Sequence, residues 1–115
     1  LVSAETVAEI NARLVAEVEA AGGRIDGVYI CPHRPEEGCD CRKPLPGLLH
    51  QAALALDLDL SRSYLIGDAE SDIIAALAVC AQPILVLTGR GKVQRPRLAG
   101  LEGMFQICQD LPEAA

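Results

Sequence analysis

The sequence predicts one α/β domain, or part of one, built on a doubly wound parallel sheet of the Rossmann-like kind. Its 115 residues, half of them apolar, are enough for about one packed domain. Helical and strand-like patterns alternate along the chain, as they do in α/β folds. Two predicted strands, 64–66 and 84–87, are uninterrupted apolar runs. Such runs are typical of parallel strands that helices cover on both faces.

The first half of the chain should contain two helices and one strand. Ser3 can cap a helix whose apolar residues recur every three or four positions, and the glycine pair at 22–23 should end it. Residues 25–30 fit a short strand, which leads into a loop rich in Cys, His and Pro at 31–46. Residues 47–56 again have helical spacing, so we expect a second helix there.

The second half should supply the rest of the sheet. Apolar runs alternate there with breaks that contain glycine, and one helical pattern lies between the first two runs. Cys80 and Cys108 lie in apolar surroundings, so we expect both to be small core residues. The expected elements are strands at 64–66, 84–87 and 104–108, a helix at about 71–79, a basic proline-containing loop at 90–97, and a short helix or no regular structure at 109–115.

Composition argues against several classes of function. Sixteen acidic and ten basic residues give a net charge of −6, which disfavours binding to nucleic acids and to anionic membranes. No apolar stretch approaches the roughly 20 residues that a membrane-spanning helix needs. The five cysteines and the first residues fit neither a disulfide framework nor a secretory signal, so we expect a cytoplasmic protein.

The densest group of potential ligands predicts a zinc site. Cys31, His33, Cys39 and Cys41 fall within eleven residues, and thiolates with imidazole are the ligands of structural, four-coordinate Zn²⁺. The alternative is a chance grouping of buried thiols with a surface histidine. Four ligands in one polar loop are hard to explain by core packing, so a structural zinc is the preferred interpretation.

The residues that follow predict phosphate chemistry. Arg42 and Lys43 are adjacent cations on a loop with prolines, and such a pair can hold a phosphate group; alone, it could equally be a solvated basic pair. Asp68 and Asp72 follow a predicted parallel strand and offer oxygen ligands suited to Mg²⁺; alone, they could simply favour a helix N-terminus. Together, the two groups favour phosphoryl transfer.

Three motifs carry a family resemblance. CPH with CDCRKPLPG (residues 31–47), GDAESD (67–72) and VLTGRG (86–91) resemble, in order and spacing, the D-glycero-D-manno-heptose 1,7-bisphosphate phosphatases. These enzymes form part of the histidinol-phosphatase branch of the haloacid dehalogenase superfamily. The resemblance extends from the first predicted helix to the tail. It implies a haloacid dehalogenase-type domain that removes the 7-phosphate of the heptose bisphosphate in envelope-sugar biosynthesis, a step of lipopolysaccharide synthesis.

The resemblance also implies roles for individual residues. Arg42 and Lys43 would contact the phosphorylated sugar, with Lys43 acting in catalysis. Asp68 would bind the catalytic Mg²⁺, and Asp72 would be a supporting carboxylate that orients Lys43. The zinc ligands would be Cys31, His33, Cys39 and Cys41.

One expected feature of the family is missing from the chain. Enzymes of this superfamily attack phosphorus with an aspartate of an Asp-x-Asp motif that follows an apolar strand. The only such motif here, Asp57-Leu58-Asp59, follows a predicted helix, and we interpret it as a helix-end loop. We therefore expect residues 1–115 to be the carboxyl-terminal two-thirds of one phosphatase domain, with a zinc loop at 31–41. Leu1 would then lie downstream of the nucleophile, and the isolated chain would have little activity.

Two other functions remain open. A histidinol-phosphate phosphatase would carry a similar loop, and the residues present do not separate the two substrates. The isolated chain could also be a non-catalytic, zinc-stabilised fragment. A nucleic-acid-binding zinc ribbon is disfavoured by the acidic net charge, although four of the ten basic residues cluster at 90–97. The sequence does not predict an oligomeric state.

Overall fold

A computed structural model describes residues 3–30, 43 and 45–115 of the chain. Helices and parallel strands alternate in it from residue 47 onward, as the sequence predicts. The elements are α1 (Ala4–Ala20), α2 (Gly47–Leu56), the 3₁₀ turn η2 (Leu60–Arg62), β1 (Tyr64–Gly67), α3 (Glu70–Ala78), β2 (Gln82–Val86), α4 (Gly91–Gln94), the 3₁₀ turn η3 (Arg95–Leu98), β3 (Gln106–Cys108) and α5 (Leu111–Ala114).

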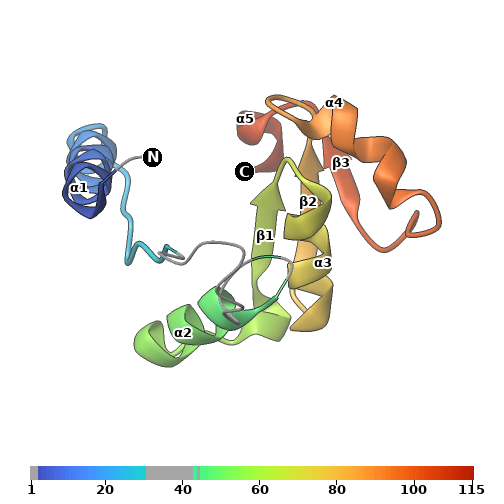
Figure 1. Ribbon diagram of the computed structural model, residues 1–115, viewed down its shortest axis with the longest axis horizontal. Coiled ribbons are helices and arrows are strands. Elements are labelled where there is room, and N and C mark those ends of the chain that lie inside the picture. Colours follow the sequence, from blue (N-terminus) through green and yellow to red (C-terminus); the bar gives the residue numbers. More distant parts are fainter. Residues whose placement is uncertain (1–2, 31–42, 44) are drawn as a thin grey trace.

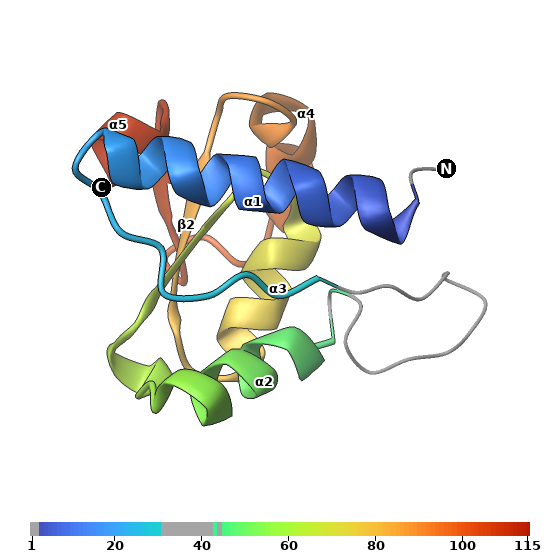
Figure 2. The same cartoon turned by 90° about the vertical axis from the view of Figure 1, so that its left-hand side faces the viewer.

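The three strands form one parallel sheet in the order β1-β2-β3, with Leu65 opposite Pro83 and Leu85 opposite Ile107. Parallel neighbours need a crossover, and α3 provides it between β1 and β2. Figures 1 and 2 together place α3 on one face of the sheet and α5 on the other. This arrangement confirms the predicted doubly wound α/β class.

The hydrophobic core lies in the second half of the chain. Ile73 of α3, Leu85 of β2 and Leu98 of η3 are essentially inaccessible to solvent and pack together. Burial of a side chain of this size stabilises a fold by about 1.5–3 kcal/mol, so these three residues bind helix, sheet and turn into one unit. Leu77, Leu87, Leu101 and Phe105 pack around them.

The first helix begins and ends where its sequence predicts. The Ser3 hydroxyl accepts a hydrogen bond from Thr6 N at 3.1 Å, and Gly22 just beyond the helix has φ +92°. The helix α1 packs less extensively against the rest of the chain than its apolar stripe predicts. No residue of α1 is buried, and Ile10 and Leu14 are 57% and 49% exposed. In Figure 1, α1 stands apart from the sheet.

The strand expected at 25–30 is a wrong prediction. These residues have no regular secondary structure, and they pair with no strand of the described sheet. A strand is defined by hydrogen bonds to a neighbour, and alternating apolar residues cannot create that neighbour. Val28 and Ile30 consequently remain 42% and 48% exposed.

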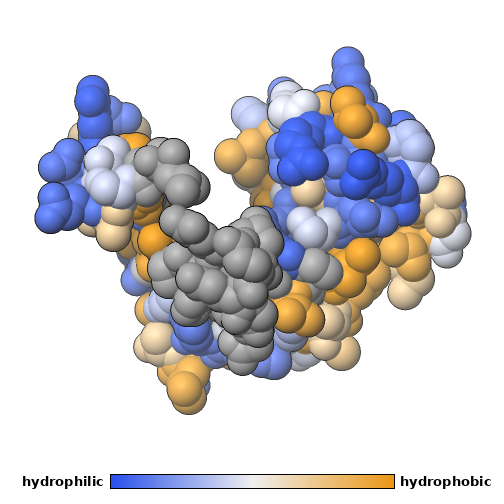
Figure 3. Space-filling model, in the orientation of Figure 1, coloured by the Kyte–Doolittle hydropathy of each residue, from blue (hydrophilic) through white to orange (hydrophobic). Residues whose placement is uncertain are grey.

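The basic segment at 90–97 is helical rather than a loop. It forms α4 and η3, with Pro96 near the start of η3, where proline is tolerated. Burial of Leu98 fixes the turn against the core, while the basic side chains face solvent. Figure 3 shows the resulting hydrophilic surface where α4 lies.

Cys80 is also placed differently from the prediction. It is exposed, with φ 62°, because it follows the end of α3 in the left-handed conformation that usually selects glycine. Cys108 is partly buried in β3. Within the described ranges, no helix has both the length and the apolar character needed to cross a membrane.

Candidate functional site

The candidate site lies at the carboxyl end of β1, where parallel α/β sheets bind their ligands. The strand ends at Gly67, Asp68 occupies the following turn, and α3 begins at Glu70. Asp68 Oδ2 accepts a hydrogen bond from Arg90 N at 3.0 Å. Since Arg90 follows β2, this contact joins the ends of two neighbouring strands.

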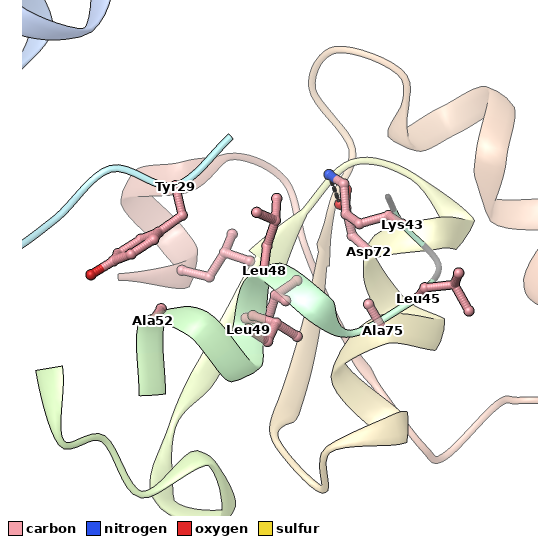
Figure 4. A pocket seen from close by; sticks show the side chains of 10 residues that line it. Tyr29, Lys43, Leu45, Leu48, Leu49, Ala52, Asp72 and Ala75 are labelled. Carbon is pink, nitrogen blue, oxygen red and sulfur yellow. Dashed lines mark hydrogen bonds and ion pairs between the residues drawn. The ribbon is translucent and has the colours of Figure 1, made fainter. Parts of the chain in front are cut away.

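Asp72 is the buried carboxylate of the site. Its side chain is only 8% exposed, and both oxygens have partners: Oδ1 accepts from Lys43 Nζ, and Oδ2 accepts from Ala69 N at 3.2 Å. The bond to Ala69 N satisfies a free donor at the start of α3, in the manner of a capping box. The Lys43 side chain is half exposed, so its ammonium group is held at the protein surface by a buried anion. Figure 4 shows the pair.

Gly67 makes this arrangement sterically possible. A Cβ atom built on Gly67 would overlap the Asp72 carboxylate. The strand backbone and the carboxylate can therefore approach only because residue 67 has no side chain. In the GDAESD motif, the glycine at the first position thus allows the strand backbone to approach the carboxylate at the last position, and a second carboxylate, Asp68, follows the glycine.

A cavity of about 310 Å³ adjoins the ion pair. Its walls are mainly apolar, and Figure 4 shows the Lys43–Asp72 pair at one end of it. Side chains from α2 and β1 meet in this cavity. The helix that follows the predicted phosphate-binding pair in the sequence is therefore next to the first strand. The lining residues are Tyr29, Lys43, Leu45, Leu48, Leu49, Ala52, Leu65, Ile66, Asp72 and Ala75.

Several predicted site residues lie outside the described part of the chain. They are Cys31, His33, Cys39, Cys41 and Arg42. Among residues 3–30, 43 and 45–115, no group of three or more His, Cys, Asp or Glu side chains could hold a metal ion. The zinc site and the role of Arg42 therefore remain predictions.

The only Asp-x-Asp sequence lies away from the site. Asp57 ends α2 with φ 54°, and the Asp59 side chain accepts from Ser61 N at 3.1 Å as the cap of η2. Both precede β1, whereas Asp68 follows it. Their interpretation as a helix-end loop is confirmed.

Asp68 fits the chemistry of a magnesium ligand. One of its oxygens is taken by Arg90 N, and the other has no hydrogen-bond partner among the described residues. Mg²⁺ commonly uses one or two carboxylates and completes its shell with water and substrate phosphate. The single Asp68 oxygen that has no partner among the described residues is compatible with that pattern.

Sequence reasoning missed Gln94. This residue of α4 is 3% exposed, and its Oε1 accepts from Glu70 N at 3.1 Å. No local pattern marks it, because the two residues are 24 positions apart. Only the fold places them together.

Comparison with known proteins assigns the family. A model of the HAD-hydrolase-like family matches residues 40–114, well over half of the chain. The chain belongs to the HAD-hydrolase-like family. The resemblance first seen in its motifs is therefore confirmed at the level of the family.

Two relatives of this HAD-hydrolase-like chain carry the same name. The D-glycero-beta-D-manno-heptose-1,7-bisphosphate 7-phosphatase of Pseudomonas putida is 47% identical over 87 residues, which are 76% of this chain and 50% of that protein. The protein of the same name from Bordetella bronchiseptica is 36% identical over 110 residues, 96% of this chain and 61% of that one. The chain thus spans about half to three fifths of the length of these relatives.

A solved structure supports the same relationship. The crystal structure of D,D-heptose 1,7-bisphosphate phosphatase from B. bronchiseptica, complexed with magnesium and phosphate, superimposes with a TM-score of 0.88 at 34% identity. The alignment covers 97% of this chain and 62% of that one. The HAD-type fold is therefore shared over nearly all of the HAD-hydrolase-like chain described here.

Proposed function

We propose that this chain is part of a phosphatase that removes the 7-phosphate from D-glycero-D-manno-heptose 1,7-bisphosphate. The observation that carries the proposal is the Lys43–Asp72 ion pair, whose carboxylate belongs to the segment that follows β1 and also carries Asp68. A surface ammonium held by a buried anion can neutralise a phosphoryl group, and Asp68, one oxygen of which has no partner among the described residues, can hold the Mg²⁺ that adds positive charge. Relatives 47% and 36% identical carry this activity in their names.

Each residue has a distinct part in the proposed site. Lys43, with Arg42 beside it, binds the phosphoryl oxygens of the sugar substrate. Asp72 holds the Lys43 ammonium in place, and Asp68 provides one magnesium ligand. The bound Mg²⁺ supplies positive charge against the phosphoryl oxygens. The structure of the Bordetella relative, complexed with magnesium and phosphate, supports this choice of cation.

A structural zinc would organise the loop that precedes Lys43. We assign Cys31, His33, Cys39 and Cys41 as its ligands, on the strength of their spacing in the sequence. A four-coordinate ion with no open position takes no part in bond breaking. Its effect would be to hold Arg42 and Lys43, which follow directly after the last ligand.

The nucleophile would come from residues outside this chain. The chain covers only 50–61% of the relatives' length, and its Asp-x-Asp sequence lies at the opposite end of β1 from Asp68. Residues 1–115 would then form the carboxyl-terminal part of a cytoplasmic phosphatase domain, somewhat less of it than the two-thirds expected from the sequence. The described site would supply phosphate and metal binding but not the attacking carboxylate.

Phosphate release tests this proposal. The chain alone and the chain joined to the amino-terminal segment of the Bordetella relative are each incubated with Mg²⁺ and either heptose 1,7-bisphosphate or histidinol phosphate. We expect release only by the joined protein, and preferentially from the heptose bisphosphate. Asp68→Asn and Lys43→Met in the joined protein should each lower kcat by about 10²-fold or more, as removal of one electrostatic stabiliser does.

Three results would contradict the proposal. Turnover by the chain alone would place the nucleophile within it and bring Asp57 and Asp59 back into consideration. Preference for histidinol phosphate would overturn the substrate. Full activity of Asp68→Asn would remove that residue from the metal site, whereas Asp59→Asn, which lies at the other end of β1, serves as the control expected to retain activity.

A further inference from the structure

We propose that Gln94 is a positioning residue that holds the Asp68–Glu70 turn in the shape that binds the metal. The inference rests on the proposed magnesium role of Asp68. Gln94 and Asp72 are the buried polar residues of the described chain. Buried polar side chains are nearly always hydrogen-bonded, and the hydrogen bond of Gln94 is made to the turn that carries Asp68.

The partner is the first backbone amide of α3. Glu70 N is one of the free donors at the start of α3. A side chain at the N-cap position reaches only the second or third amide of a helix, so Glu70 N needs a partner from another element. Gln94 Oε1 accepts from Glu70 N at 3.1 Å. The side chain of one helix thus caps another helix, at the turn that carries Asp68.

The same short segment also holds Asp68 itself. Arg90 N, at the start of α4, donates to Asp68 Oδ2 at 3.0 Å. The turn is therefore held at two places, through the Asp68 carboxylate and through Glu70 N. Both contacts come from residues 90–94, so the position of α4 determines the shape of the turn.

The position of α4 is itself fixed by close packing. Gly91 is buried, and a Cβ atom on it would overlap the carbonyl oxygen of Val86, at the end of β2. The backbone of α4 therefore packs closely against the end of β2, and this contact sets the distance between α4 and the sheet. Arg90 N occupies one Asp68 oxygen, and the other oxygen has no partner in residues 3–30, 43 and 45–115, so it can bind a cation.

Site-specific binding of Mn²⁺, used as a probe for Mg²⁺, tests the inference on this chain. Paramagnetic broadening of the Asp68 and Ala69 amide signals is followed by NMR during a Mn²⁺ titration. Gln94→Met should weaken binding at Asp68 about fivefold, the equivalent of one ordinary hydrogen bond. Gln94→Glu, which retains an acceptor for Glu70 N, should bind at least as tightly as the unmodified chain.

Gln51→Met is the matched control, because Gln51 is exposed on α2. It should leave the titration unchanged. All variants are compared at a temperature where each is fully folded, so that a loss of stability alone does not change the measured affinity.

The outcomes separate this inference from the proposed function. If the unmodified chain shows no broadening at Asp68, the magnesium role fails and the inference fails with it. If it does bind, but Gln94→Met binds equally well, only the positioning role of Gln94 is refuted. Equal weakening by Gln94→Met and Gln94→Glu would also refute it, because the acceptor would then not be what matters.

Discussion

The contribution of the Lys43–Asp72 pair can be measured by a double-mutant cycle. In Asp72→Asn, the remaining side-chain oxygen still accepts the hydrogen bond from Ala69 N, because Ala69 is buried. The new amide group then replaces the carboxylate oxygen that faces the Lys43 ammonium. A hydrogen bond to a charged group is worth about 1.5–3 kcal/mol, and the 50% exposure of the Lys43 side chain moves the expected loss to the lower end. We therefore expect Asp72→Asn to lower the free energy of unfolding by about 1.5 kcal/mol.

Lys43→Met and the double variant complete the cycle, with urea unfolding followed by circular dichroism. We expect a coupling free energy of about 1 kcal/mol, the upper end for partly exposed pairs, because Asp72 is buried. The exposed pair Arg13–Glu17, whose side chains are 82% and 67% exposed, serves as the comparison. Its coupling free energy should be at most about 0.3 kcal/mol. Coupling within about 0.3 kcal/mol of zero for Lys43–Asp72 would refute the claim that the buried carboxylate holds the ammonium.

Three further substitutions test other features. Cys80→Gly should raise the free energy of unfolding by about 1 kcal/mol, because the φ of 62° at this position is strained for any residue with a side chain. Cys80→Ala should leave it unchanged, and equal effects of the two substitutions would contradict this explanation. Gly91→Ala should lower the free energy of unfolding by about 3 kcal/mol, because the new Cβ atom overlaps the Val86 carbonyl oxygen. A urea unfolding midpoint close to that of the unmodified chain would contradict this close approach. Cys41→Ser should lower the zinc content of the purified chain measured by atomic absorption, and unchanged zinc would refute its role as a ligand.

Local signals predicted the helices and the parallel strands well. Ser3 caps α1, and α2 spans 47–56 as its apolar spacing indicates. The apolar run at 64–66 lies in β1, and the run at 84–87 lies in β2 except for its last residue. These predictions succeed because caps, periodicity and glycine breaks act within a few residues. The pairing of Lys43 with Asp72 was also anticipated, although only through a family resemblance.

Features that depend on distant partners were not predictable in the same way. Residues 25–30 have a strand-like pattern, but no neighbouring strand in the described sheet pairs with them. The segment at 90–97 is polar and contains a proline, yet it is helical, and Leu98 at its end packs into the core. The role of Gln94 depends on a contact with Glu70 that only the folded chain creates.

The exposed helix α1 has a consequence for how the chain unfolds. Most of the stability of a helix in a protein comes from packing of its apolar face, and α1, with 17 residues, has no buried residue to provide it. Its hydrogen bonds should open locally and often, so that its amide protons exchange with solvent rapidly. Amides of α3, which carries Ile73 at the centre of the core, should exchange only when the sheet itself opens. A substitution that stabilises the core would then slow exchange in α3 and leave α1 unchanged, because the two helices belong to different cooperative units.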